Sequence, residues 1–145
     1  MTATDGRALI HSSFYKFVPL ADPDEVVRVL RELVAPLTGS ILVAEEGING
    51  VLAGTPEALQ AVEESLVKDD RLHGACAGIY FKHSECKTKP FWKVRVHRKR
   101  EIVALGIPGV SGAQDHDTST HLNPQAWRDL IAQDNVVIID NRNSF

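Results

Sequence analysis

The stretch SILVAEEGINGVLA, residues 40–53, is typical of a β-hairpin. Residues 40–44 and 51–53 are short apolar runs of the kind that form strands, and EEGING lies between them. Asn49-Gly50 is a strong tight-turn signal because both residues tolerate a positive φ. We therefore expect two antiparallel strands joined by a turn at Asn49-Gly50.

A strand and a helix are predicted before this hairpin. Residues 12–18 (SSFYKFV) are rich in aromatic and β-branched residues and end at a proline, as strands often do. Asp22 is a good helix N-cap, Pro23 suits the first helical position, and Glu25 completes a capping-box pattern. The apolar face of this helix is expected to be Val26, Leu30, Leu33 and Leu37.

A second helix and a further strand are predicted after the hairpin. Thr55-Pro56-Glu57 starts the helix, and residues 77–82 (AGIYFK) are typical of a strand. The apolar face of the second helix is expected to be Leu59, Val62 and Leu66. The order βαββαβ predicts an α+β ferredoxin-like sandwich, in which two helices cover one face of a four-stranded antiparallel sheet. The other face then needs a cover or a ligand.

The next part of the chain predicts an extra hairpin and a linker. Val94 and Val96 alternate with basic residues, and residues 101–105 (EIVAL) supply a second strand for that hairpin. Residues 106–120 contain three glycines and a proline without any periodicity, which is typical of a linker. We therefore assign residues 1–105 to one ferredoxin-like domain.

Residues 121–145 predict the truncated start of a second, α/β domain. Asn123-Pro124 caps a short helix, and residues 136–139 (VVII) form the continuous apolar run of a buried parallel strand. Such a strand needs neighbours on both edges, and no further strand follows in this sequence. We expect this region to be held less firmly than the first domain, and its strand to be able to pair with another copy of the chain.

Composition bounds the class of protein. The chain has 145 residues, of which 43% are hydrophobic and 24% charged, and these values are ordinary for a globular protein. The formal net charge of −3 argues against a uniformly basic protein that coats DNA, so no DNA partner is expected. No apolar run is long enough to span a membrane, and the first residues do not resemble a secretion signal. These features predict a cytoplasmic protein whose two cysteines, Cys76 and Cys86, are reduced.

Positive charge is concentrated in one segment. Between Lys82 and Arg100 there are eight lysines and arginines and one acidic residue, whereas the rest of the chain has eight basic and eighteen acidic residues. A local basic surface attracts polyanions because exposed charges are screened beyond about 10 Å. Aromatic residues in the segment could stack on an unpaired base. The predicted RNA-binding residues are Lys82, Lys87, Lys89, Phe91, Trp92, Lys93, Arg95, Arg98, Lys99 and Arg100. The alternative is a solvated hairpin with its two aromatic rings buried underneath.

Two other clusters contain residue types that occur in functional sites. His73-x-x-Cys76 and His83-x-x-Cys86 resemble paired zinc ligands, but an extended AGIYFK segment would separate the pairs by about 20 Å. No metal site is therefore expected. Glu45 and Glu46 are adjacent carboxylates, but consecutive residues of an extended chain face opposite sides, so a hairpin is favoured over acid–base or metal chemistry.

Several short motifs occur in a recognisable order. They are FYKF at residues 14–17, LVAEEGINGV at 42–51, PF at 90–91 followed by KVRV at 93–96, PxxW at 124–127 and IDNRN at 139–143. From about residue 12 to the end, this chain resembles the rhodanese-domain tRNA uridine hydroxylases. The motif loop of Glu46, Gly47, Asn49 and Gly50 and the element with Asp140 and Arg142 carry the resemblance most specifically.

The resemblance implies a function and a division of labour. Such proteins have a ferredoxin-like domain followed by a rhodanese domain, and they form 5-hydroxyuridine at the tRNA wobble position with molecular oxygen as co-substrate. The resemblance implies no catalytic residue in this chain, because the reactive cysteine of that family lies beyond the D-x-RN strand. The chain would then be the tRNA-contacting N-terminal part of such an enzyme, with any other cofactor unknown.

The sequence leaves two alternative functions. The first is a rhodanese-type sulfurtransferase whose N-terminal module binds an acidic protein partner through the basic segment. The second is acylphosphatase activity, which is disfavoured because the first predicted strand leads into PLADPD and not into a glycine-rich, arginine-containing phosphate loop.

Overall fold

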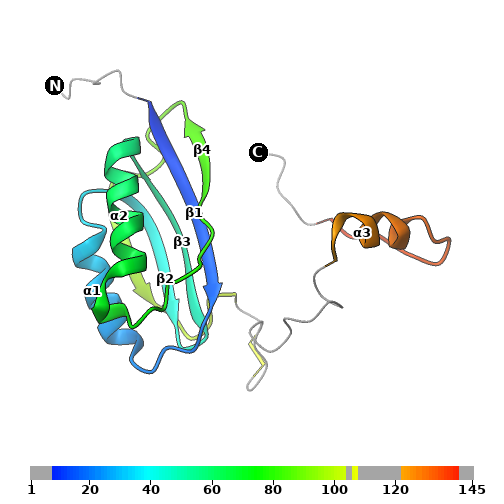
Figure 1. Ribbon diagram of the computed structural model, residues 1–145, viewed down its shortest axis with the longest axis horizontal. Coiled ribbons are helices and arrows are strands. Elements are labelled where there is room, and N and C mark those ends of the chain that lie inside the picture. Colours follow the sequence, from blue (N-terminus) through cyan, green and yellow to red (C-terminus); the bar gives the residue numbers. More distant parts are fainter. Residues whose placement is uncertain (1–7, 104–105, 108–121, 141–145) are drawn as a thin grey trace. The chain divides into compact units, whose positions relative to one another are not determined.

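The computed structural model describes residues 8–103, 106–107 and 122–140 (Figure 1). The chain divides into two compact units, residues 1–113 and 114–145. Most of the predicted linker and the residues from 141 onward, including Arg142, lie outside the described part.

The first unit is built on a five-stranded sheet with the order β4-β1-β3-β2-β5. The strands are β1 (Leu9–Phe17), β2 (Thr38–Ala44), β3 (Gly47–Gly54), β4 (Lys82–Cys86) and β5 (Val94–Arg98). β5 pairs with β2 in parallel, and the other neighbouring strands are antiparallel. The predicted α+β ferredoxin-like class is confirmed, with β5 as an additional edge strand.

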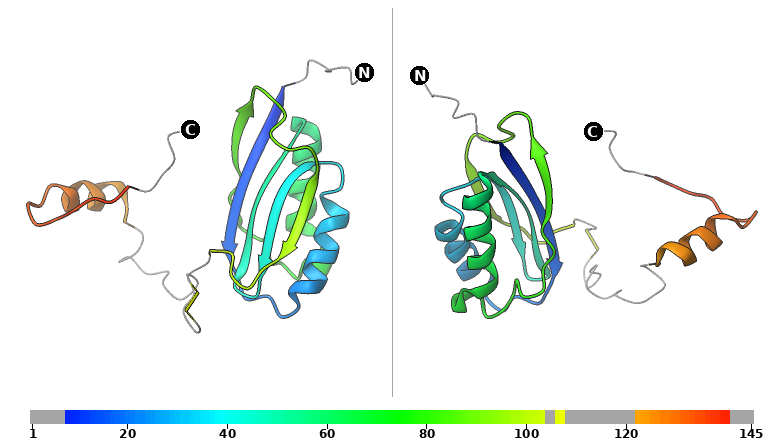
Figure 2. Two further views of the ribbon diagram at one scale, coloured as in Figure 1. Left: turned by 180° about the vertical axis from the view of Figure 1, so that it is seen from behind. Right: turned by 45° about the horizontal axis from the view of Figure 1, so that its top comes forward.

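Two helices cover one face of this sheet. α1 (Pro23–Leu33) begins where Asp22 accepts a hydrogen bond from the Glu25 backbone N at 3.1 Å, and α2 (Pro56–Lys68) begins at Thr55 in the same manner. Both predicted caps are confirmed. Figure 2 shows the sheet from behind, where no helix lies over the strands. The first unit therefore has one covered face and one open face.

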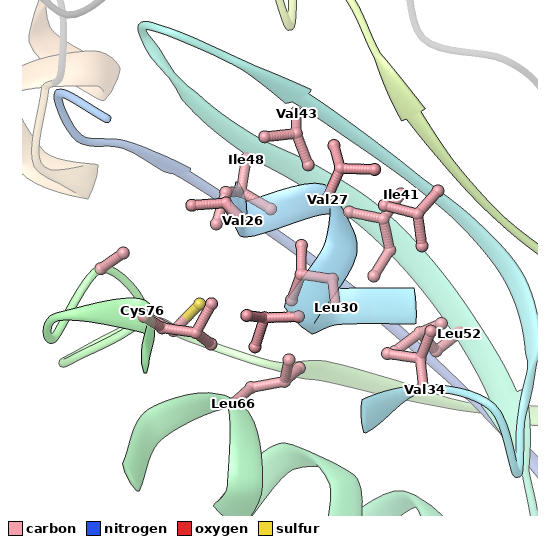
Figure 3. Close-up of a cluster of buried hydrophobic side chains, with 14 of the residues drawn as sticks. Val26, Val27, Leu30, Val34, Ile41, Val43, Ile48, Leu52, Leu66 and Cys76 are labelled. Atoms are coloured by element: carbon pink, nitrogen blue, oxygen red, sulfur yellow. The ribbon is translucent and has the colours of Figure 1, made fainter. Parts of the chain in front are cut away.

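The core lies between the helices and the covered face (Figure 3). Leu30 of α1 and Leu66 of α2 meet Ile41, Ile48 and Leu52 of the sheet, and each of these side chains is at most 1% exposed. Burying an aliphatic side chain of this size stabilises the fold by about 1.5–3 kcal/mol. Packing of the two helices on the three central strands is thus the main source of stability.

One polar cluster connects α2 to two strands. Ser12 on β1 is fully buried, and its hydroxyl donates to Glu63 Oε1 at 2.6 Å. His83 on β4 lies 2.7 Å from the same carboxylate oxygen through Nε2. Because Ser12 and His83 are directly paired across the two strands, a single carboxylate holds the edge strand β4 against the domain.

The hairpin of residues 40–53 is present, but its predicted turn is wrong. The turn is at Glu45-Glu46, and Asn49 and Gly50 lie within β3. Gly50 is required for space: a Cβ there would lie 2.7 Å from Phe14 Cζ and 3.0 Å from Ile41 Cγ1. A ring that packs directly on the backbone requires a glycine there, and so does a tight turn. The glycine at residue 50 is therefore consistent with either structure, which explains why the predicted turn is at the wrong place.

The strand predicted at residues 77–82 is also misplaced, because β4 begins at Lys82. The preceding residues make successive turns, in which the backbone N of Ala75, Ala77 and Ile79 each donates to the carbonyl three residues earlier. Phe81 then packs edge-on against Phe14, with ring centroids 5.3 Å apart. Ile79 and Phe81 therefore pack against the core from a loop, whereas Tyr80 is exposed.

The predicted extra hairpin is wrong as well. β5 pairs with β2 on its inner side, and residues 101–103 form no strand. After β5, the backbone N of Lys99 donates to Val43 O, and that of Ile102 donates to Glu46 Oε1 at 2.6 Å. The chain thus turns across the β2–β3 end of the sheet, so residues 101–103 do not return along β5.

The described part of the second unit contains α3 (Pro124–Ile131), capped by Asn123 as predicted. Residues 136–140 are not in a strand, and the side chains of Val137, Ile138 and Ile139 are exposed. The prediction of a buried strand is therefore not met in this chain, because the strand partners it needs are not among the described residues.

We expect Gly50→Ala to lower the free energy of unfolding by about 1–3 kcal/mol, because the added methyl group overpacks the core. Asn49→Ala is the matched control. It changes the neighbouring residue on the open face, where a change of about 0.5 kcal/mol or less is expected. Urea unfolding of both variants checks this. Equal losses would support a turn at Asn49-Gly50 over the packing argument.

We expect the amides of residues 136–139 to exchange with solvent much faster than those of residues 41–43, which are hydrogen-bonded on both sides within the sheet. Hydrogen exchange on a dilute sample measures this difference. Equal protection in the two segments would contradict it, and protection that appears only at high protein concentration would indicate self-association through this strand.

Candidate nucleic-acid interface

The basic segment does not form one continuous stripe. Lys82 lies on β4, at one edge of the sheet, whereas Lys93 directly precedes β5 at the opposite edge. The residues between β4 and β5 pass from one edge to the other, and Lys87 and Lys89 within them are exposed. The structure therefore presents positive charge along both edges of the sheet.

A basic groove runs along the free edge of β5. Its volume is about 510 Å³. The lining residues are Arg31, Ala35, Lys93, Val94, Arg95, Val96 and His97. Val94 and Val96 supply an apolar floor, because alternate residues of β5 turn toward the core. The predicted alternation is thus confirmed, and it leaves Arg95 and His97 exposed.

Arg31, in the last turn of α1, also lines this groove and is not among the predicted RNA-binding residues. Its guanidinium donates to Val96 O at 3.1 Å and so satisfies one carbonyl of the free strand edge. Arg31 is 65 residues from that partner, and the α1 pattern assigns it only to a helix face. The packing of α1 beside β5 therefore adds Arg31 to the groove as a third cation, together with Lys93 and Arg95.

Arg98 differs from the other cations of the segment. Its guanidinium lies 3.5 Å from both the Asp24 and the Glu45 carboxylates, on the helix-covered side. It also donates to its neighbour's carbonyl, Lys99 O. Arg98 therefore stabilises the end of β5 against α1 and the β2–β3 turn, and it is a poorer phosphate ligand than Arg95 or Lys99.

The two aromatic residues of the basic segment differ in how far they are exposed to solvent. Trp92 is 92% exposed, and Phe91 is half-buried. Trp92 is therefore not the buried core residue of the alternative interpretation, and its ring faces solvent beside Lys93. Lys99 and Arg100, just beyond β5, are likewise exposed.

The motif loop around Glu46 has a structural role in the described part. Glu45 pairs with Arg98, and Glu46 accepts from the Ile102 backbone, so the two carboxylates have different partners. Gly47 has a φ of +150°, and a Cβ there would lie 2.0 Å from Lys16 O. The loop thus connects β2, β3 and the residues after β5.

The paired histidines and cysteines are separated by the fold. Cys76 is in the core at 1% exposure, where burial raises the pKa of its thiol to about 11 despite the nearby charge of Lys16. His83 lies beside Glu63. No group of three or more metal-ligating side chains occurs in the described part of the chain.

No described helix is long and apolar enough to cross a membrane.

The loop between β1 and α1 does not provide an anion cradle. The backbone N of Val18 donates to Glu46 O and that of Leu20 donates to Glu45 O, both at 2.9 Å, and Pro19 has no N–H. A phosphate loop needs several such N–H groups pointed at the ligand. In this loop, the N–H groups of Val18 and Leu20 are instead bonded to carbonyls of the Glu45-Glu46 turn. This bonding argues against acylphosphatase chemistry.

Architecture and charge together define a ferredoxin-like α+β domain with a basic sheet edge and an open sheet face. Residues 9–102 match the family described as the UPF0176 acylphosphatase-like domain. The chain belongs to this family.

Curated relatives carry the name tRNA uridine(34) hydroxylase. That of Jannaschia sp. is 39% identical over 92% of this chain and 43% of its own length. Those of Nitrobacter winogradskyi and Legionella pneumophila are 37% and 33% identical, over 52% and 53% of their lengths. The chain thus spans about half the length of the curated relatives it matches.

We expect the two cysteines to differ sharply in reactivity. At pH 8 a disulfide reagent should titrate only Cys86, which is half-buried, because Cys76 is shielded and about 0.1% of it is thiolate at a pKa of about 11. Cys76 should react only when the protein unfolds in denaturant. The Cys86→Ser variant is the control, and rapid labelling of that variant would contradict the buried position of Cys76.

Proposed function

We propose that this chain is the tRNA-contacting N-terminal part of a tRNA uridine(34) hydroxylase. The name shared by the relatives supports the reaction class. The observation that supports tRNA contact is the groove along β5, where Arg31, Lys93 and Arg95 converge on the free edge of a sheet in a protein with a net charge of −3.

The geometry suits phosphate contact in particular. Arg95 and Lys93 are exposed cations on a rigid strand edge, and the counterions released when they neutralise phosphates favour binding to any nucleic acid. Trp92, exposed beside them, can stack on an unpaired base. The anticodon arm of tRNA provides both a phosphate backbone and unpaired bases.

In this proposal the domain holds and presents the tRNA. Catalytic groups belong to the rhodanese domain of the intact protein, and molecular oxygen is the co-substrate. Positioning a base against a reactive centre converts an encounter into an intramolecular step, which is the contribution a binding domain makes to catalysis. The location of such an enzyme would be the cytoplasm, where its tRNA substrate is found.

Replacing Lys93, Arg95 and Lys99 together with alanine should weaken tRNA binding and reduce its salt dependence. Each lost phosphate contact should lower the slope of log K against log salt by about 0.7–0.9. Arg98 is left in place because its ion pairs support the fold. Fluorescence anisotropy with labelled tRNA at several salt concentrations measures the slope.

A single-charge comparison controls for the change in net charge. Arg95→Ala should reduce the slope, whereas Lys68→Ala, which removes an exposed cation from the last turn of α2, should not. Equal slopes for the wild type and the triple variant would overturn tRNA contact by this edge and favour an interaction module for an acidic protein. The reaction itself is tested by measuring 5-hydroxyuridine in tRNA from cells with and without the intact gene.

A further inference from the structure

The open face of the sheet has an unusual charge pattern. Residues that are directly paired across strands point to the same side, and the rows that alternate with the helix-facing ones belong to the open face. Across the five strands, all of which the structure describes, this face has no aspartate or glutamate. Glu63, Glu25 and Glu32, in contrast, come from the helices on the covered side.

One row of this face runs across all five strands with a cation at each end. In register, it is Lys82, Ser13, Val51, Ser40 and Arg95. Four strand spacings of about 4.8 Å place the Cα atoms of Lys82 and Arg95 about 19 Å apart. That span suits a short extended stretch of two or three nucleotides, with phosphates near both edges and bases over the central strands.

The next row supplies a platform for a base. It is Tyr15, Asn49, Leu42 and His97. Tyr15 lies on β1, between the two edges, and is 60% exposed. The Phe17 ring contacts it edge-on, with centroids 6.2 Å apart, so the Tyr15 ring is supported from the side. Asn49 beside it has an amide that can both donate to and accept from a base edge.

We propose that this open face binds two or three unpaired RNA nucleotides, with one base stacked on Tyr15 and flanking phosphates at Lys82 and Arg95. The proposal rests on the proposed function and adds a second surface to the β5 groove. Single-stranded RNA is the occupant because its backbone supplies negative charge for both edges and its bases supply aromatic planes for the centre, and because the proposed function makes RNA the substrate. A carboxylate-free face with a cation at each edge is complementary to that ligand.

The test uses the 145-residue chain and two labelled RNA octamers, one of uridines and one with abasic sugars throughout. Tyr15→Leu should weaken uridine octamer binding by about five- to one-hundredfold and leave abasic octamer binding unchanged, since only the stacking contact is lost. Tyr15→Phe, which keeps the ring, should bind both octamers as the wild type does. Lys82→Ala should weaken both octamers and lower the salt slope by about 0.7.

Controls separate this result from misfolding and from the β5 groove. Trp127→Leu alters a half-exposed aromatic ring in the other compact unit and should change neither affinity. Urea midpoints identify any variant that is merely unstable. If Tyr15→Leu is unstable, the difference between uridine and abasic octamer affinity in the wild type still tests the stacking contact. Equal uridine and abasic affinities in the wild type, or an unchanged Tyr15→Leu, would overturn the stacking site. If Lys93 and Arg95 still set the salt slope for tRNA, the proposed function survives that failure.

Discussion

The position of the Phe14 ring over Gly50 determines much of the first unit. The ring lies where any side chain at residue 50 would have to be, and it also contacts Phe81 from the segment before β4. β1 and β3 can therefore pair in register only with glycine at that point, and the loop that leads to the edge strand packs on the same ring. Around this contact the two helices cover one face of the sheet.

Because the helices cover only one face of the sheet, acidic and basic side chains are distributed unequally between its two faces. The helices contribute carboxylates on the covered side, and two carboxylates of α1 form ion pairs, Glu25 with Arg28 and Glu32 with Arg71. The open face and the β5 edge have cations without carboxylates from the strands. A protein with a net negative charge can thus present a positive surface to a polyanion, because attraction acts over about 10 Å and not over the whole molecule.

The candidate site was only partly predictable. The basic segment was visible in the sequence, and its alternation correctly placed Val96 inward and Arg95 outward. Three features depended on distant contacts: Arg31 joins the groove from α1, Arg98 is bound to Asp24 and Glu45, and Tyr15 comes to lie beside Asn49. Pairing over such sequence distances leaves no local pattern, since each residue looks like an ordinary member of its own helix or strand.

The amino-acid sequence by itself determined the helices with their caps, the βαββ order and the family motifs, because these depend on local backbone preferences and on short-range periodicity. Tertiary structure decided the turn at Glu45-Glu46, the start of β4 at Lys82 and the parallel pairing of β5 with β2. Glycine illustrates the difference. Its presence at residue 50 satisfies either a turn or a ring packed on the backbone, and only the packing of Phe14 distinguishes the two.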